Sequence, residues 1–420
     1  MMTFAAGALR GRIRVPGDKS ISHRALILAA AGREPVTIRN LNSGRDVRAT
    51  ANVLQSLGVR IAYEGDAAIV TGAPLRDPAE TLDCMNSGST ARMMLGVCAG
   101  ANLRATFDGD ASLRKRPMEP VSAQLRAFGA QIETADGLLP TTIAGTASPQ
   151  TRRFILVSAS AQIKSALLFA GVFGNVALAT AGDKGSRDHT ERLLRYFGAD
   201  IAFDRANVEL RSGPTAFEPV DVAGDFSAAA FFMVAASVAP GSHLTIEDVG
   251  VNPSRTGLLD ALLQMGASIS LENQRERCGE PVADVVVRHA HLHGTQIGAE
   301  LALRAIDEIP VLSVAAAFAR GETRITGIRE LRTKESDRVA AIERMLAAVA
   351  VEVEHLPNGI AIAGGAPVAG GALIETHHDH RTAMSVAALA AGAGPLAIDS
   401  EASIDVSFPD FTQTLARAQA

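Results

Sequence analysis

LAAAGREPVTI, at residues 28–38, is the stretch that decides the fold, because the chain repeats its pattern five more times. In each copy an alanine-rich, helix-like run ends at a turn glycine and continues into a short β-branched strand. The other copies lie at residues 96–107, 171–180, 237–246, 317–326 and 389–398. The six glycines, 67 to 80 residues apart by subtraction, are Gly32, Gly100, Gly174, Gly241, Gly321 and Gly394. This period exceeds the roughly 20–50 residues of solenoid repeats.

A second phrase lies between the copies of the first. LQSLGVRI, LRAFGAQI, LRYFGADI and LLQMGASI place their glycines at Gly58, Gly129, Gly198 and Gly266. Each predicts an amphipathic helix that ends at a glycine and is followed by strands. The repeat is therefore a βαβαββ unit, and six units predict an α/β fold of two similar domains with three units each.

The domain boundaries follow from the repeat. We expect an N-terminal domain at residues 19–222 and a C-terminal domain made of residues 1–18 and 223–420. Residues 1–18 would form a strand that completes the final, incomplete unit, so the chain would begin in the C-terminal domain, cross over and return. The active site would lie in the cleft between the domains.

The composition excludes several classes of protein. The 420 residues, 47% of them hydrophobic, can bury two cores, and a net charge of −5 argues against a broad nucleic-acid or membrane surface. No apolar run approaches the ~20 residues of a spanning helix, and residues 1–14 lack a signal-peptide pattern, so we expect a cytoplasmic protein. Cys84, Cys98 and Cys278 lack metal-type spacing, which predicts reduced, buried thiols.

PGDKSISHR, at residues 16–24, predicts a turn followed by a helix start that Ser20 or Ser22 would cap. Lys19, His23 and Arg24 are all capable of carrying positive charge. A helix N-terminus beside such side chains is suited to a phosphate or carboxylate. Taken alone, the stretch fits a solvated basic turn equally well.

Similar polar segments occupy the same places in other repeats, just before an alanine-rich helix or just after the strand that follows it. NSGSTAR, at residues 86–92, opens an apolar helix but lacks the lysine and the spacing of a P-loop. LRKRPME, SASAQIKS and GSRDHTE contribute Arg114, Lys115, Arg116, Ser158, Ser160, Gln162, Lys164, Ser186, Arg187 and His189. Singly, each fits a surface charge run, a helix cap or a surface turn.

The second half supplies carboxylates. IDEIP places Asp307 and Glu308 in an apolar stretch, where they would be partly desolvated. RTKESDR, at residues 332–338, and HHDHR, at residues 377–381, add acids, bases and histidines. Arginine directly after the histidines would repel a cation, so we expect no metal. Cations from both halves predict a small polyanion bound between the two domains.

Taken together, the segments resemble the 5-enolpyruvylshikimate-3-phosphate synthases of the enolpyruvyl transferase family, in order and approximate spacing, from Pro16 to the Phe411 of SFPDF. The resemblance implies a shikimate-pathway transferase of chorismate and aromatic amino-acid biosynthesis, the target of glyphosate. It would transfer the enolpyruvyl group of phosphoenolpyruvate to the 5-hydroxyl of shikimate 3-phosphate through a tetrahedral adduct, releasing phosphate. The family's fold has two domains of three βαβαββ units. We expect a monomer with small-molecule substrates, no cofactor, and no nucleic-acid or membrane partner.

The resemblance also assigns residues. The implied shikimate 3-phosphate ligands are Lys19, Ser20, Arg24, Ser160, Gln162, Ser186, Asp307 and Lys334. The implied phosphoenolpyruvate ligands are Lys19, Gly88, Arg116, Gln162, Arg338 and Arg381. Asp307 would act as base toward the hydroxyl, with Glu335 and Lys19 on the acid side. Further candidates are Asn86, Arg92, Ala161, Arg187 and His380.

The chain departs from the best-known bacterial members at three positions. Val406 stands where many have lysine, Glu330 where they have asparagine, and Arg187 where some have an aromatic residue. SAQIKS and RDHTE are more typical of the family's second sequence class. These departures concern the cradle for the phosphate of phosphoenolpyruvate.

Two other functions remain as alternatives. A UDP-amino-sugar enolpyruvyl transferase shares the fold but carries an active-site cysteine in a mobile loop, and the corresponding residues 108–120 contain none. A non-catalytic polyanion-binding protein would keep the arginines without needing the carboxylates of Asp307 and Glu335.

Overall fold

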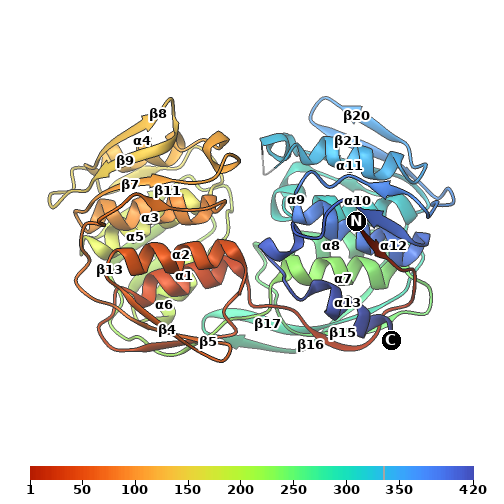
Figure 1. Cartoon of the computed structure of the whole chain (residues 1–420), viewed down its shortest axis with the longest axis horizontal. Coiled ribbons are helices and arrows are strands. Elements are labelled where there is room, and N and C mark those ends of the chain that lie inside the picture. Colours follow the sequence, from red (N-terminus) through yellow and green to blue (C-terminus); the bar gives the residue numbers. More distant parts are fainter. Residues whose placement is uncertain (334–335) are drawn as a thin grey trace. The chain divides into compact units, whose positions relative to one another are not determined.

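The computed structural model describes residues 1–333 and 336–420 and divides the chain into two compact units (Figure 1). Unit 1 consists of Met1–Pro16, Gly224–Arg275 and Pro281–Ala420. Unit 2 consists of Gly17–Ala223 and Glu276–Glu280. The chain therefore begins and ends in unit 1.

Unit 2 contains three four-stranded sheets with one shared topology. The first two strands across each sheet are parallel, and the other neighbours are antiparallel. In spatial order, the strands of the first sheet are β14 (Val220–Asp221), β3 (Val36–Arg39), β5 (Ala67–Thr71) and β4 (Arg60–Glu64). Those of the second are β6 (Leu82–Asp83), β7 (Arg104–Asp108), β9 (Leu138–Ala144) and β8 (Gln131–Ala135). Those of the third are β10 (Arg153–Ile155), β11 (Leu178–Ala181), β13 (Val208–Ser212) and β12 (Asp200–Phe203). The helices are α1 (Lys19–Ala29), α2 (Arg45–Ser56), α3 (Gly88–Gly100), η1 (Leu113–Lys115), α4 (Glu119–Phe128), α5 (Ala161–Phe173) and α6 (His189–Tyr196).

The described part of unit 1 contains two sheets of four strands and one of three. In spatial order they are β16 (Ser268–Arg277), β17 (Glu280–Arg288), β15 (His243–Gly250), β2 (Arg10–Arg14); β18 (Gln296–Ile297), β19 (Gly321–Thr326), β21 (Gly359–Gly364), β20 (Val353–Leu356); and β1 (Met2–Phe4), β23 (Leu396–Ile398), β22 (Leu373–Ile374). The helices are α7 (Phe226–Val238), α8 (Gly257–Gln264), α9 (Ala299–Arg304), α10 (Ile309–Phe318), η2 (Arg329–Thr333), α11 (Arg338–Ala347), α12 (His380–Ala393), η3 (Ile404–Val406) and α13 (Phe411–Gln419).

The predicted repeat is confirmed. In one complete unit the chain order is β6, α3, β7, α4, β8 and β9, which is βαβαββ. The expectation of one N-terminal strand was wrong, because β1 and β2 are separate strands. β1 pairs with β23 in the last sheet, as expected for the incomplete unit, whereas β2 pairs with β15 in the sheet of the fourth repeat. A two-residue strand far along the chain, β14, opens the first unit by pairing with β3.

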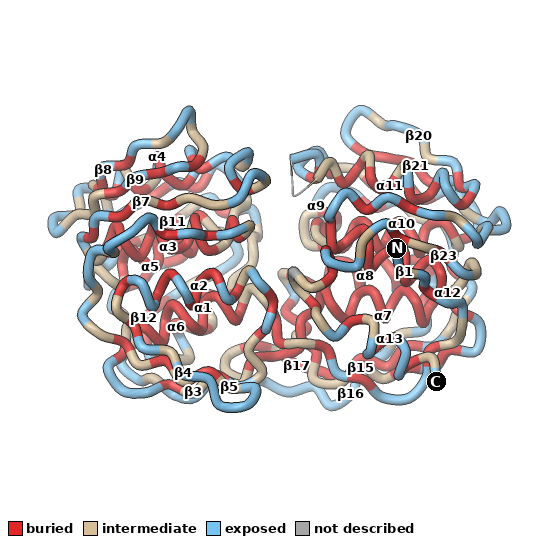
Figure 2. The backbone as a smooth tube through the Cα atoms, viewed as in Figure 1, coloured by how far each residue is buried: buried red, intermediate tan, exposed pale blue. Residues whose placement is uncertain are grey.

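The alanine-rich helices form the centre of each unit. In unit 1, α7, α10 and α12 contact one another, and all 13 residues of α7 are buried (Figure 2). A helix that is apolar on every side belongs in a core. In unit 2, α3 and α5 pack closely at Gly96, which has no side chain. A Cβ at this position would lie 2.1 Å from the carbonyl oxygen of Ala166. The charged side chains of these helices therefore lie near the helix starts.

Across the described residues, none of the helices combines the length and the apolar character that a bilayer crossing requires. Cys84 and Cys98 are buried thiols, as expected, but Cys278 is only half-buried.

Candidate active site

The first residue of α1 is Lys19, and the residue before it caps the helix. Asp18 Oδ1 accepts a hydrogen bond from the backbone N–H of Ile21 at 2.8 Å. The predicted caps were therefore wrong: Ser22 Oγ instead accepts from the N–H of Asn42 at 3.0 Å. Lys19 Nζ lies 2.9 Å from Asp46 Oδ2, and the two side chains are only 18% and 13% exposed. The helix start thus holds an oriented ammonium group.

His23 and Arg24, on the same helix, point into the interior of unit 2. Burial lowers the pKa of His23 to about 3, so this residue is neutral and does not add to the positive charge expected here. Burial lowers the pKa of Arg24 to about 10, which leaves its guanidinium charged at neutral pH. Arg24 donates to the carbonyl of Ser20, to Thr190 Oγ1 and to Ser165 Oγ at 2.7–2.9 Å. It therefore ties the first turn of α1 to α5 and α6.

The loop before α3 joins two of the candidate segments. Ser87 caps α3 through its Oγ, which accepts from the N–H of Thr90 at 3.2 Å. Asn86 donates to Asp110 Oδ2 at 2.6 Å and accepts from the guanidinium of Arg116. Gly88 is the first helical residue and is buried. The contacts place Arg116 next to the start of α3.

Gln162 links α5 to α3. Its Oε1 accepts from Arg92 NH1 at 2.8 Å, and its Nε2 donates to Ser89 Oγ at 2.9 Å. Arg92 also donates to the carbonyl of Pro117 at 3.1 Å. These bonds fix which way the Gln162 amide faces and bring the Asn86–Arg92 loop together with the SAQIKS segment.

Ser160 and Ser186 lie at the starts of two helical segments of unit 2. Ser160 Oγ caps α5 by accepting from the N–H of Ile163 at 3.4 Å, and Ala161 is the first helical residue. Ser186 donates its N–H to Asp183 Oδ1 at 3.1 Å and its hydroxyl to Asp183 Oδ2 at 2.7 Å. Arg187 follows in the same loop and is half-buried. The loop is therefore anchored by Asp183.

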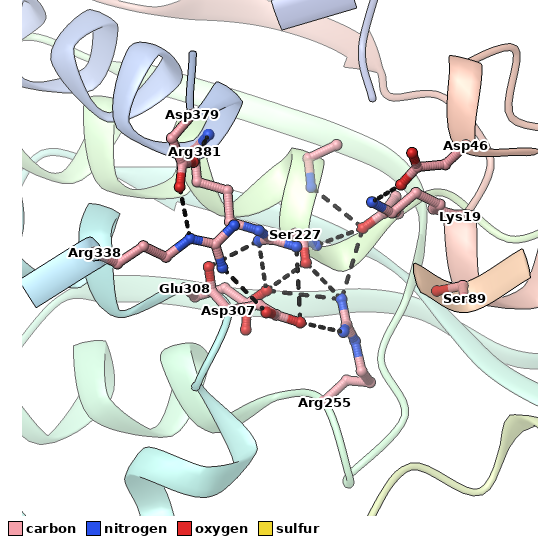
Figure 3. Close-up of polar contacts among 12 residues, drawn as sticks. Lys19, Asp46, Ser89, Ser227, Arg255, Asp307, Glu308, Arg338, Asp379 and Arg381 are labelled. Atoms are coloured by element: carbon pink, nitrogen blue, oxygen red, sulfur yellow. Dashed lines mark hydrogen bonds and ion pairs between the residues drawn. The ribbon is translucent and has the colours of Figure 1, made fainter. Parts of the chain in front are cut away.

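In unit 1, Asp307 lies two residues before α10 and among three arginines (Figure 3). Its carboxylate is 15% exposed, and its oxygens lie 3.8 Å from Arg255 NH1, 3.5 Å from Arg338 NH1 and 3.8 Å from Arg381 NH2. Arg381 also donates to the carbonyl of Asp307 at 2.8 Å. Guanidinium groups in such a cluster can bind the carboxylate or phosphate of an anionic ligand.

Buried carboxylates hold these arginines in place. Arg338 Nε donates to Asp379 Oδ2 at 2.9 Å, and Asp379 Oδ1 caps α12 by accepting from the N–H of Arg381 at 2.8 Å. Glu308 is 1% exposed and accepts a short hydrogen bond from Ser227 Oγ. His380, the first residue of α12, is also buried. The HHDHR segment thus serves as a helix cap, and the described residues contain no group of three or more metal-type ligands suited to a cation.

Two further charged residues of this cluster, Arg255 and Asp225, were not predicted from the sequence. Arg255 follows β15, donates to Ser227 Oγ at 2.6 Å and lies 3.7 Å from both Asp225 Oδ1 and Glu308 Oε1. Asp225 caps α7 by accepting from the N–H of Ser227 at 2.7 Å. Both occupy the positions that mark the other segments, before a central helix and after the next strand. Applying that rule to the fourth repeat would have found them.

Two assigned residues, Lys334 and Glu335, lie outside the described residues. Arg24 and Arg92 lie in the second turns of α1 and α3, and every other assigned residue that the structure describes lies at a helix start or in a loop beside one. The assigned residues are divided between the two units. Unit 2 contains Lys19, Arg24, Arg116, Gln162 and Ser186, and unit 1 contains Asp307, Arg338 and Arg381.

Comparisons with known proteins identify the family of the chain. The chain matches the family model described as EPSP synthase (3-phosphoshikimate 1-carboxyvinyltransferase) over residues 5–415. It is 46% identical over 426 residues to the 3-phosphoshikimate 1-carboxyvinyltransferase of Gloeobacter violaceus, which covers 99% of this chain and 98% of the relative. The enzyme of the same name from an Anaeromyxobacter species is 44% identical over 409 residues, covering 96% and 95%. Among solved structures, EPSP synthase from Acinetobacter baumannii superposes with a TM-score of 0.88 at 37% identity, covering 99% of this chain and 98% of that one.

Proposed function

This chain belongs to the EPSP synthase (3-phosphoshikimate 1-carboxyvinyltransferase) family, and from that premise we propose how its residues carry the reaction. The enzyme transfers the enolpyruvyl group of phosphoenolpyruvate to the 5-hydroxyl of shikimate 3-phosphate, a step of the shikimate pathway. The observation that carries the residue assignment is the Asp307 carboxylate, 15% exposed, with three guanidinium groups 3.5–3.8 Å away.

Asp307 acts as the base in the proposed mechanism. It accepts the proton of the 5-hydroxyl while that oxygen attacks the phosphate-bearing carbon of phosphoenolpyruvate. The methylene carbon takes a proton from the acid side, assigned to Glu335 with Lys19. The tetrahedral adduct then loses phosphate and a proton from the methyl group, which restores the double bond. The assignment of Glu335 rests on the family resemblance alone.

Charged side chains bind the two anionic substrates. Lys19, Ser20, Arg24, Ser160, Gln162, Ser186 and Lys334 are the proposed ligands of shikimate 3-phosphate. Lys19, Gly88, Arg116, Gln162, Arg338 and Arg381 are the proposed ligands of phosphoenolpyruvate. In this proposal residues of both units act on the same pair of substrates. Preorganised donors of this kind contribute about 2.7–4 kcal/mol each to stabilising the charge that develops in a transition state.

The experiment measures phosphate release with each substrate omitted in turn. Release should require both phosphoenolpyruvate and shikimate 3-phosphate, and a UDP-amino sugar should not replace the acceptor. Asp307→Asn should lower kcat by at least about a hundredfold, since it removes a general base. Asp136→Asn, at an exposed turn, is the matched control and should leave kcat unchanged. Equal release with the UDP-amino sugar, or an Asp307→Asn enzyme of normal kcat, would overturn the assignment.

Compartment and assembly belong to the same proposal. We propose a cytoplasmic monomer, and the three free cysteines fit the reducing environment of that compartment. Light scattering coupled to gel filtration should give a mass near 43.7 kDa. A mass near twice that value would contradict the monomer.

A further inference from the structure

Lys164 is a buried charged residue that the proposed reaction does not use. It lies on α5 two residues after Gln162, and its Nζ is 2.7 Å from Asp183 Oδ2 and 2.7 Å from Glu191 Oε1. The side chains of Lys164, Asp183 and Glu191 are 3%, 2% and 1% exposed. This cluster joins α5 to the loop after β11 and to α6.

Such a cluster is costly to bury, and apolar side chains of similar volume often stabilise a protein as well or better. Burial alone would lower the pKa of Lys164, but the charges of Glu191 and Asp183 outweigh it and raise the pKa, so the ammonium stays charged. The charged guanidinium of Arg24 is close enough to be influenced by Glu191. Two cationic groups and two carboxyl groups therefore meet in one buried cluster, which packing alone does not require.

The role follows from what Asp183 holds. Its Oδ2 accepts hydrogen bonds from the Lys164 ammonium and from the hydroxyl of Ser186, each at 2.7 Å. Its Oδ1 accepts a hydrogen bond from the N–H of Ser186 at 3.1 Å. A serine hydroxyl can donate one hydrogen bond, and here it donates that bond to Asp183. To donate to a phosphate, Ser186 must turn that proton away from Asp183.

We propose that Lys164 is a positioning residue for recognition of the 3-phosphate of shikimate 3-phosphate by Ser186, an inference that rests on the proposed function. When the hydroxyl turns to the phosphate, the Asp183 carboxylate keeps the Lys164 ammonium and the Ser186 N–H. It is therefore not left unpaired in a buried place. Without Lys164, Asp183 competes with the phosphate for the serine proton.

The experiment compares ligands with and without the phosphate. Dissociation constants of shikimate 3-phosphate and of shikimate are measured by calorimetry for the full-length wild type and for Lys164→Met. The variant should bind shikimate 3-phosphate about tenfold more weakly, the effect of one hydrogen bond to a charged group. Its affinity for shikimate and its KM for phosphoenolpyruvate should stay within about twofold. A purely structural role would weaken both ligands alike.

Two further variants complete the design. Lys184→Met removes an exposed lysine next to Asp183 and should leave both affinities unchanged. If Lys164→Met does not fold, Lys164→Met/Glu191→Gln removes one charge of each sign from the cluster and carries the same test.

Ser186→Ala separates the two proposals. It should reduce the preference for shikimate 3-phosphate over shikimate. If it does so while a folded Lys164 variant keeps the wild-type preference, or weakens both ligands equally, the positioning role is wrong and the function stands. If Ser186→Ala keeps the preference, the phosphate role of Ser186 is wrong, and the role of Lys164 fails with it.

Discussion

Acid should destabilise unit 2 through His23. This residue is completely buried on α1, with Nδ1 2.7 Å from Thr50 Oγ1, which lies 2.8 Å from Thr90 Oγ1. Burial lowers its pKa from 6.5 to about 3, and the opposing charge of Asp46 does not offset this. The folded protein therefore keeps a neutral imidazole at pH values where the unfolded chain takes up a proton.

The sign and size of the effect follow from these two pKa values. Because the pKa of His23 is lower in the folded state, the unfolded state binds more protons between pH 6.5 and about 3, and the free energy of unfolding falls as the pH falls. Each pH unit below 6.5 costs about 1.4 kcal/mol. From pH 7.5 to 5.0 the 1.5 units below 6.5 should cost about 2 kcal/mol through His23 alone.

The assay compares urea unfolding of the wild type and His23→Asn at pH 7.5 and 5.0, followed by circular dichroism. Asparagine places a nitrogen donor near the position of Nδ1 and keeps a partner for Thr50, but it does not titrate. Other groups titrate equally in both proteins, so the wild type should lose about 2 kcal/mol more than the variant. An equal loss in both proteins would show that His23 is not a buried neutral group, and the account of α1 would have to be revised.

Two further substitutions test the site. In Gly88→Ala the new methyl group would lie 2.7 Å from Arg92 NH1, so Arg92 must shift and weaken its bond to Gln162. We expect a several-fold higher KM for phosphoenolpyruvate and a larger rise in the inhibition constant of glyphosate, measured at matched saturation; an unchanged constant would contradict the placement of this loop. Arg255→Lys keeps the charge but loses the planar fork that faces several carboxylates, and we expect kcat to fall at least about tenfold. The exposed Arg324→Lys is its control, and equal kcat values in the two variants would refute a role for Arg255.

The repeat could be predicted because each unit carries the same two local signals, an alanine-rich helix ending at glycine and a second helix ending at glycine. The partners of the shortest strands could not. β14 has two residues and pairs with a strand more than 180 positions earlier, at Val220↔Ile38. No local pattern specifies such a pairing, which depends on how the assembled helices leave one sheet edge open. For the same reason, the sequence did not predict that residues 1–18 form two strands, β1 and β2, which pair in two different sheets.

The places of the candidate residues in the fold were predictable from the sequence, and their chemical states were less so. Lys19, Gly88, Asp307 and Arg381 all lie at helix starts, as the segments indicated. The neutrality of His23 was not predictable, because it depends on burial that only the packing of neighbouring helices determines.

The caps at these helix starts also revise how anions are bound. The sequence suggested that unused N–H groups at the helix N-termini would take the phosphate. In the structure Asp18, Ser87 and Ser160 each accept from an N–H of α1, α3 or α5, and Asp225 and Asp379 each accept from two in α7 and α12. Three of these caps are carboxylates, which repel an approaching anion at the same place. Side-chain cations must therefore supply most of the attraction, which explains why arginine and lysine gather beside capped helix starts. Substrate binding should accordingly weaken as ionic strength rises, and KM values measured across a salt series check this. KM values that do not change with salt would contradict the main role of the side-chain cations.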